Sequence, residues 1–253
     1  MAKYKAALLF LAVAATANAG WAIRSTDSEP GRADVLYRHI ILENTTAPHG
    51  AVVDLAIFSA KSCALRVIDN PLGKTLSDTL AREKCVAGVN GGYFSSDFEP
   101  VGLLISDGKM MARLQRARLL TGVLVGSSRN VQILRVGEFS RQPKMNAAIQ
   151  CGPFLVEHYE HIRGLNDSAL ARRTFVATGR NDRVALGVCS EISLAELATI
   201  LAETPLVYDF KIQRALNLDG GSSSAFWFAR ENGSAFSIPE EKSVRDFVAV
   251  VPR

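Results

Sequence analysis

Short apolar or alternating runs recur along most of the chain, and they predict a protein rich in β-strands. Runs of this length, bounded by glycine, proline, asparagine or serine, are typical of strands that bury one or both faces. The runs cover residues 35–42, 51–59, 64–69, 86–90, 101–106, 119–125, 131–136, 147–156, 174–178, 184–189, 215–219, 225–228 and 247–251.

Two segments have helical periodicity. The first helix begins at Ser193, which forms a capping box with Glu196, and ends before Pro205. The second covers residues 75–83, where Leu76 and Leu80 lie one turn apart. Strands with a few helices predict an α+β (mixed α/β) fold, a sheet-rich single domain with helices packed on a mixed sheet.

The first 19 residues have the features of a secretory signal. Lys3 and Lys5 precede an apolar run at 6–15, and Ala17-Asn18-Ala19 fits a small-residue cleavage site. The run is shorter than the roughly 20 residues that a membrane anchor needs. We therefore expect a secreted or periplasmic protein with no stable membrane insertion after signal removal. Residues 20–34 are predicted to be a flexible lead-in and 35–253 the folded domain.

The composition gives no sign of nucleic-acid binding or of a zinc site. With 29 Lys and Arg against 25 Asp and Glu, the charge is nearly balanced and nothing demands nucleic acid. Four cysteines in an exported chain suggest disulfides, although four allow three pairings; Cys63 with Cys85 is one candidate bridge. The lack of a C-x-x-C spacing argues against a structural zinc site or a redox pair.

Two apolar runs end in a polar residue and a glycine pair. One run ends in Asn90-Gly91-Gly92 and the other in Asp219-Gly220-Gly221. A tight turn is the ordinary explanation of each glycine pair. Two such ends suggest one shared site, where backbone N–H groups converge on an anionic or strongly polar ligand.

Other candidate motifs fail on their spacing. Gly220-Gly221-Ser222-Ser223-Ser224 lacks the final glycine of the serine-hydrolase elbow. Residues 157–161 contain two histidines but do not match the metalloprotease helix, and they are predicted to form a hairpin tip. His39 and His49 have no acidic or cysteine partner at ligand spacing, so structural or exposed roles are expected.

The order of several motifs resembles the phosphodiester glycosidase family, over roughly residues 35–253. Two departures are a loose match at 175–183, where the family has a short glycine hairpin, and Cys151, where relatives commonly have a small residue. The matching motifs are Asn90-Gly91-Gly92-Tyr93-Phe94, Pro100-Val101-Gly102-Leu103 with Asp107-Gly108-Lys109, Gln150-Cys151-Gly152-Pro153-Phe154-Leu155-Val156, Arg173-Thr174, and Leu216-Asn217-Leu218-Asp219-Gly220-Gly221-Ser222-Ser223.

The resemblance implies an exported hydrolase that cleaves a sugar-1-phosphodiester at the anomeric carbon, releasing free sugar and a phosphomonoester. Asp219 is then the general base on water or the stabiliser of an oxocarbenium-like transition state. Arg173 would pair with phosphate oxygens, and Asn90 would hold the sugar or the phosphate. The expected substrate-binding residues are Gly91, Gly92, Thr174, Gly220, Gly221, Ser222 and Glu99.

The implied partner is a sugar-phosphate-containing small molecule or an envelope glycan. Two alternatives are a non-catalytic envelope module that binds glycan or anionic polymer, and a metal-dependent phosphodiesterase. No cofactor is expected. Asp219, Asn217 and backbone carbonyls would suit a bound calcium ion, although no calcium-loop spacing is present.

Overall fold

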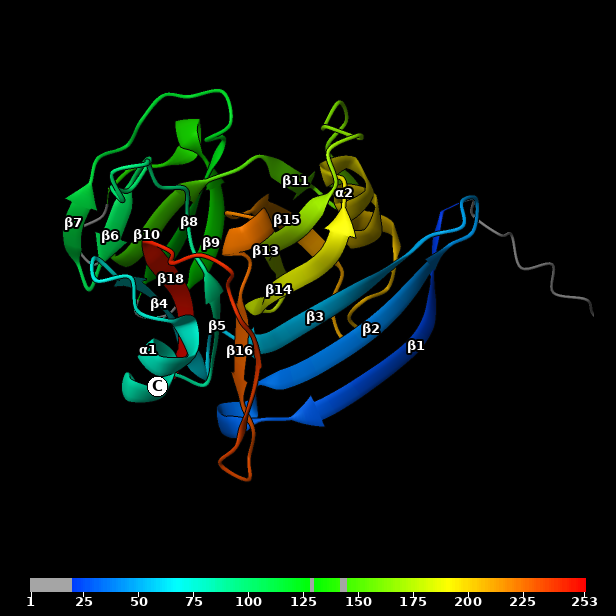
Figure 1. The fold of residues 1–253 in the computed structure, drawn as a ribbon, viewed down its shortest axis with the longest axis horizontal. Coiled ribbons are helices and arrows are strands. Elements are labelled where there is room, and N and C mark those ends of the chain that lie inside the picture. Colours follow the sequence, from blue (N-terminus) through cyan, green and yellow to red (C-terminus); the bar gives the residue numbers. More distant parts are fainter. Residues whose placement is uncertain (1–19, 128–129, 142–144) are drawn as a thin grey trace, which may run out of the picture.

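The computed structural model describes residues 20–127, 130–141 and 145–253, which form three β-sheets and two α-helices (Figure 1). The predicted signal at 1–19 lies outside the described residues. Every strand pairing among the described residues is antiparallel. With two α-helices against eighteen strands, the described residues form a mostly β fold, so the predicted α+β fold with helices on a mixed sheet is wrong. Parallel pairs need long crossovers, usually helical, whereas short hairpins join most strands here.

The large sheet has eight strands and begins with the segment predicted to be a lead-in. Residues 21–30 form a strand that pairs from Trp21↔Asn44 to Pro30↔Leu36, so that prediction is wrong. The strand is at the sheet edge and none of its residues is buried, which explains its polar sequence. In spatial order the strands are β1 (Trp21–Pro30), β2 (Leu36–Asn44), β3 (Gly50–Ser59), β14 (Arg183–Ile192), β13 (Ala171–Gly179), β15 (Ile212–Asn217), β11 (Phe154–Glu157) and β12 (Glu160–His161).

Two five-stranded sheets lie beside the large one, on the left in Figure 1. The second sheet runs β7 (Lys109–Ala112), β6 (Leu104–Ser106), β10 (Met145–Cys151), β8 (Gly122–Ser127) and β9 (Val131–Arg135). The third runs β17 (Ala235–Ile238), β16 (Phe226–Ala229), β5 (Ala87–Asn90), β18 (Asp246–Pro252) and β4 (Cys63–Asp69). The run predicted at 147–156 is split between β10 and β11.

Both predicted helices are confirmed. Helix α2 (Leu194–Glu203) has Ser193 as its N-cap, and Ser193 and Glu196 form the reciprocal capping box. Helix α1 (Leu76–Arg82) is capped by Thr75, whose hydroxyl accepts the Asp78 N–H. One hydrophobic cluster joins α2 to the large sheet, and a smaller one joins α1 to the third sheet.

The largest part of the core fills the space between the three sheets. Val176 and Leu216 from the large sheet, Leu124 and Ile149 from the second and Val248 from the third belong to one buried cluster. All four cysteines are buried and free, so the suggested Cys63–Cys85 bridge is wrong. Within the described residues no helix is long and apolar enough to cross a membrane.

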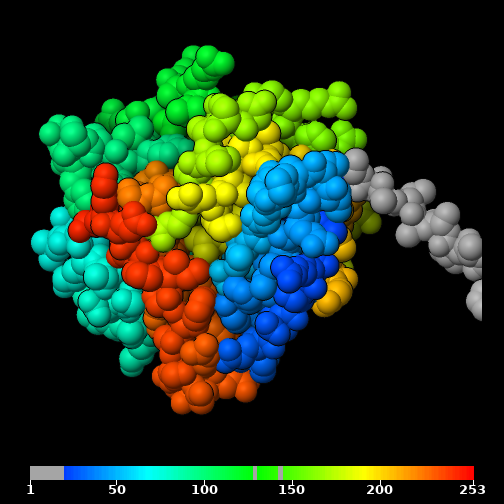
Figure 2. All heavy atoms as spheres, turned by 45° about the vertical axis from the view of Figure 1, so that its right-hand side comes forward, coloured from blue at the N-terminus to red at the C-terminus, as the bar shows by residue number. Residues whose placement is uncertain are grey.

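The first strands lie beside a late segment of the chain. Figure 2 shows the blue surface of β1 and β2 next to the orange surface that includes β16 and β17. Gly31 and Arg230 form an isolated β-bridge, and Arg230 Nε donates to Glu29 Oε1 at 2.9 Å. Tyr37 stacks on Phe228 with ring centroids 5.2 Å apart. These contacts join the large sheet to the third sheet.

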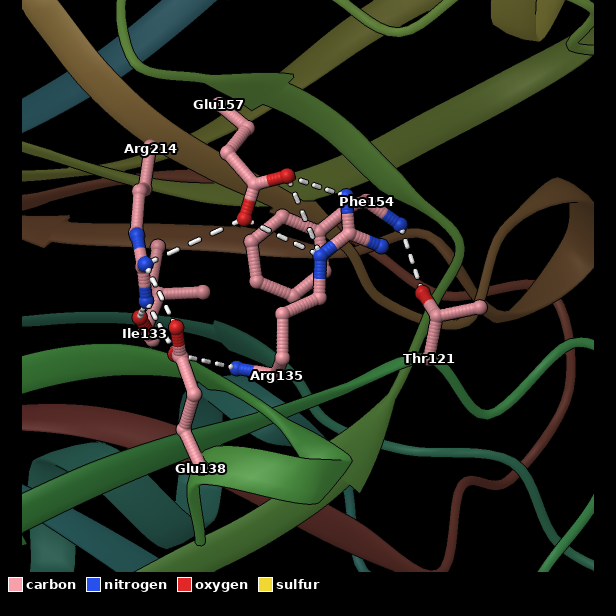
Figure 3. A network of polar contacts seen from close by, with 7 residues as sticks. All are labelled: Thr121, Ile133, Arg135, Glu138, Phe154, Glu157 and Arg214. Atoms are coloured by element: carbon pink, nitrogen blue, oxygen red, sulfur yellow. Dashed lines mark hydrogen bonds and ion pairs between the residues drawn. The ribbon is translucent and has the colours of Figure 1, made fainter.

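A polar network joins the second sheet to the large sheet (Figure 3). Arg135, at the end of β9, holds Glu157 of β11 through Nε and Nη2 and stacks 4.0 Å from the Phe154 ring centroid. Arg214 of β15 donates to Glu138 at 2.6 Å and 3.0 Å. The hydrogen bond from Arg214, with a further bond from the Arg135 backbone, lowers the pKa of Glu138 from 4.5 to about 2.

We expect Glu138→Gln to remove part of the pH dependence of stability. A carboxyl whose pKa is lower in the folded state stabilises the fold above its unfolded pKa, and that contribution is lost as pH falls through the folded pKa. The contribution of Glu138 to stability is therefore lost as the pH falls from 4.5 to about 2. Urea unfolding at a series of pH values checks this. Glu160→Gln, which changes an exposed glutamate on β12, is the control and should leave the wild-type pH dependence of stability unchanged.

Candidate functional site

The two strand ends singled out in the sequence meet between the large sheet and the third sheet. Strand β5 ends at Asn90, and Asp219 lies two residues after β15. The Asp219 N–H donates to Gly91 O at 3.0 Å, and Asn90 Nδ2 donates to Asp219 O at 2.8 Å. The backbone at Asp219 is therefore fixed by a strand from another sheet.

Asn90 is fully buried, and protein groups use its amide. Its Oδ1 accepts the Thr174 hydroxyl at 2.7 Å and the Ala225 N–H at 3.0 Å. Thr174 is also fully buried, and its hydroxyl lies 3.1 Å from Ser224 Oγ. The structure therefore makes Asn90 and Thr174 supports of Asp219, rather than the substrate contacts that the sequence suggested.

We expect Thr174→Val to destabilise the protein by about 1–3 kcal/mol, because this nearly isosteric change leaves buried hydrogen-bonding groups with fewer partners. The free energy of unfolding in urea measures the effect. Thr46→Val is the matched control, since the Thr46 hydroxyl also donates to an amide oxygen, that of Asn44 at 2.8 Å, but is exposed. Equal effects of the two changes would contradict the structural role of the buried network.

The Asp219 carboxyl is half-buried and held by the turn that follows it. Burial raises its pKa, while hydrogen bonds from the Ser223 hydroxyl and the Gly220 N–H lower it in part. The Gly220 N–H lies 2.9 Å from Asp219 Oδ1. The net result is a raised pKa, which makes the Asp219 carboxylate a better proton acceptor, as suits a group that takes a proton from water.

Arg173 lies on the other face of β13 from Thr174, because successive side chains of a strand alternate. Its Nε donates to Ile192 O at 2.9 Å and its Nη2 donates to Ala169 O. Burial lowers its pKa. No ion pair joins Arg173 to a carboxylate within the described residues, so part of its guanidinium is left for another acceptor.

The charges of both Arg173 and Asp219 act on the Tyr93 side chain. Burial raises the pKa of Tyr93; the negative charge of Asp219 adds to this rise and the positive charge of Arg173 opposes it. The Tyr93 hydroxyl donates to Gly152 O at 2.6 Å and accepts from Asn217 Nδ2 at 3.1 Å. Both charged groups therefore lie within electrostatic range of this ring.

Asp246 is the residue of this region that the sequence analysis missed. It begins β18, is 2% exposed, and accepts the Gly92 N–H on Oδ1 at 2.7 Å. Burial raises its pKa to about 7; Arg245 opposes the rise, and Asp69 and Asp219 add to it. The only signal in the sequence was an aspartate placed directly before an apolar run, without a glycine pair.

The glycine amides are mostly occupied by the protein. The Gly91 N–H donates to Asp246 O at 2.9 Å, the Gly92 N–H to Asp246 Oδ1, and the Gly220 N–H to Asp219 Oδ1. Protein groups therefore occupy these three N–H groups, and their predicted binding of an anion stays a prediction. Gly221 and Ser222 begin a 3-10 turn and are half-buried, which leaves them as candidates.

The remaining predicted residue, Glu99, is exposed on the loop after β5. Its backbone oxygen accepts the Ser95 N–H at 2.8 Å, but in the described part of the chain its carboxylate bonds to none of the other predicted site residues. Among residues 20–127, 130–141 and 145–253, no three His, Cys, Asp or Glu side chains are grouped to hold a metal ion. The calcium site stays a prediction.

Comparisons with known proteins show the family and the fold of the chain. The sequence model of the family described as "Phosphodiester glycosidase" matches residues 83–251. The chain is similar in fold to the zebrafish N-acetylglucosamine-1-phosphodiester alpha-N-acetylglucosaminidase catalytic domain auto-inhibited by its pro-peptide. The TM-score is 0.65 and the identity 16%, over 90% of this chain and 88% of that one.

Two bacterial structures share the fold. A hypothetical protein from Synechocystis matches with a TM-score of 0.58 and 14% identity, over 87% of this chain and 62% of that one. A putative exported protein from Burkholderia pseudomallei matches with a TM-score of 0.56 and 14% identity, over 83% and 77%. No curated protein matches the chain. At these identities the structural similarity shows the fold alone.

Proposed function

The chain belongs to the phosphodiester glycosidase family, and from this membership we propose that it hydrolyses a sugar-1-phosphodiester at the anomeric carbon. The products are a free sugar and a phosphomonoester. Membership of the family makes the chain a hydrolase of the phosphodiester glycosidase type. Beyond this membership, we propose which bond is cleaved, what the individual residues do and where the reaction takes place.

The observation that carries the proposal is the half-buried Asp219 carboxyl, fixed between two sheets. Its backbone is held by Asn90 and Gly91 from the third sheet, and its Oδ1 by Gly220. A carboxyl held this firmly, with a raised pKa, suits the transfer of a proton from a water molecule at one fixed position.

We assign Asp219 as the base that takes a proton from the attacking water, or as the group that stabilises positive charge on the sugar ring. A departing phosphate is a good leaving group, because its second pKa is about 6. It therefore needs less help from a second acid than the alkoxide that leaves in ordinary glycoside hydrolysis. In this proposal the Asp219 carboxylate alone assists the reaction.

Arg173 and the turn at Gly221 and Ser222 are the proposed phosphate contacts. Two of the Arg173 donors hold backbone carbonyls, which fixes the guanidinium near Tyr93 and leaves its other N–H groups for phosphate oxygens. Asn90, Thr174 and Asp246 position the site without contacting substrate.

The proposed substrate is a sugar phosphodiester found outside the cytoplasm, either a small molecule or part of an envelope glycan. The features of a secretory signal at residues 1–19 support this location. They also support a secreted or periplasmic protein.

The test is the release of free sugar from N-acetylglucosamine-1-phospho-alkyl and glucose-1-phospho-alkyl substrates by the purified chain. Release of free sugar together with alkyl phosphate supports cleavage at the anomeric carbon. Release of sugar-1-phosphate and alcohol, abolished by a chelator, would instead indicate a metal-dependent phosphodiesterase. Tight binding of both substrates without any product from correctly folded protein would indicate the non-catalytic binding module.

A further inference from the structure

The large sheet contains a fully buried arginine far from Asp219. Arg38, on β2, has no exposed surface, and in the part of the chain that the structure describes no carboxylate pairs with it. Its Nη1 donates to Leu206 O at 2.7 Å. A buried cation without a counter-charge is costly, so its persistence in the core needs an explanation.

The unsatisfied atoms of Arg38 are Nε and Nη2, both buried and without a hydrogen-bond partner. These two N–H groups lie on one edge of the planar guanidinium, the edge that binds both oxygens of a carboxylate or phosphate. The same edge is filled elsewhere in this chain. Arg66 holds Asp107 through Nε at 2.9 Å and Nη2 at 2.8 Å, and Arg135 holds Glu157 in the same way.

The loop between α2 and β15, residues 204–211, covers this guanidinium. Tyr208 stacks on it, with the Arg38 Cζ atom 4.1 Å from the ring centroid, yet Tyr208 remains 82% exposed. The loop lines a cavity of about 340 Å³ between Leu201 and Ile212. From this loop, the Tyr208 ring and the Leu206 carbonyl contact the Arg38 guanidinium.

This place is distinct from the proposed catalytic site. Arg38 pairs with Leu55, Leu55 with Gly187, Gly187 with Phe175, and Phe175 with Asn217. Four strand spacings of about 4.8 Å separate Arg38 from Asn217, or roughly 19 Å across the sheet. An anion on Arg38 would therefore not be the phosphate under attack near Asp219.

We propose that the Nε and Nη2 edge of Arg38 is a binding site for a small oxyanion, either a phosphate or a carboxylate group. The ligand enters when the loop at 204–211 lifts, and Tyr208 closes over it. Bound there, the oxyanion supplies the counter-charge and the two acceptors that Arg38 lacks.

The test is calorimetric titration of the full chain with inorganic phosphate and, separately, with acetate, with chloride replacing the anion at constant ionic strength. We expect at least one of the two anions to bind at a site that depends on Arg38, together with a rise in melting temperature. Binding of phosphate alone would assign a phosphate group, and binding of acetate alone a carboxylate. Arg38→Lys, which keeps the charge but loses the two-pronged edge, should weaken binding at least about tenfold.

Arg38→Met should abolish binding at this site and leave any phosphate binding near Asp219 in place, whereas Arg180→Met should not weaken either. Arg180 is the matched control, because it also stacks on a tyrosine ring, that of Tyr159, but is exposed. Tyr208→Ala removes the cover and should speed association. The proposal is overturned if correctly folded wild type binds neither anion, or if Arg38→Met or, should that variant not fold, Arg38→Lys binds as tightly as wild type.

Discussion

Asp219→Asn is expected to lower kcat by about 10²- to 10⁴-fold while leaving KM nearly unchanged, because a positioned acid or base contributes that much to a proton transfer. Asparagine keeps the shape of the side chain, and its amide oxygen can still accept the Gly220 N–H. It cannot take a proton from water or balance positive charge on the sugar. Steady-state release of sugar measures the effect.

The matched control for this change is Asp97→Asn, which alters an exposed aspartate on the loop after β5 and should retain wild-type turnover. Circular dichroism and the melting temperature establish that both variants fold. If Asp219→Asn hydrolysed the substrate at the wild-type rate, the assignment of Asp219 to the chemistry would be wrong. The family membership would stand, and the catalytic carboxyl would have to be sought elsewhere.

Gly91→Ala is expected to destabilise the protein by about 1–3 kcal/mol and to lower activity strongly, since overpacking a rigid interior forces the backbone to move. A Cβ atom at this position would lie 1.9 Å from Asp246 Oδ1 and 3.0 Å from Ile149 Cδ1. The same backbone segment accepts the Asp219 N–H, so its displacement moves the proposed catalytic residue. Urea unfolding and sugar release measure the two effects.

Gly137→Ala is the control for this prediction, because nothing lies within 4 Å of a Cβ atom added there. It should leave both stability and turnover near wild type. The double variant Gly91→Ala with Asp246→Ala removes the clashing carboxylate and should recover part of the lost stability. A Gly91→Ala protein as stable and active as Gly137→Ala would refute the close packing of Gly91 against Asp246.

Much of the fold could be read from the sequence, because buried strands and capped helices have strong local patterns. The run before Asn90 and the capping box at Ser193 are examples that the structure confirms. Strand β1 was missed because an edge strand with an exposed face has no apolar alternation to detect. The sheet class was wrong because pairing direction depends on partners distant in the sequence, which local periodicity does not report.

The candidate site was anticipated in part, for a similar reason. The sequence showed that Asn90 and Asp219 end strands, and the structure brings them together. Whether a polar side chain faces a ligand or a neighbour is decided by tertiary packing, so Asn90 was assigned to substrate although protein groups use its amide. Asp246 has no motif of its own, and only its position against Gly92 reveals it.

The position of β18 inside the third sheet has a consequence for how the protein folds during its synthesis. This strand lies between β5 and β4, which are separated from it by more than 150 residues of sequence. While residues 246–252 are still inside the ribosome, β5 and β4 have no strand between them, and Gly92 lacks Asp246. We therefore expect β4 to join β5 and β16 in one sheet, and Asp246 to reach Gly92, only once β18 has been translated and has left the ribosome.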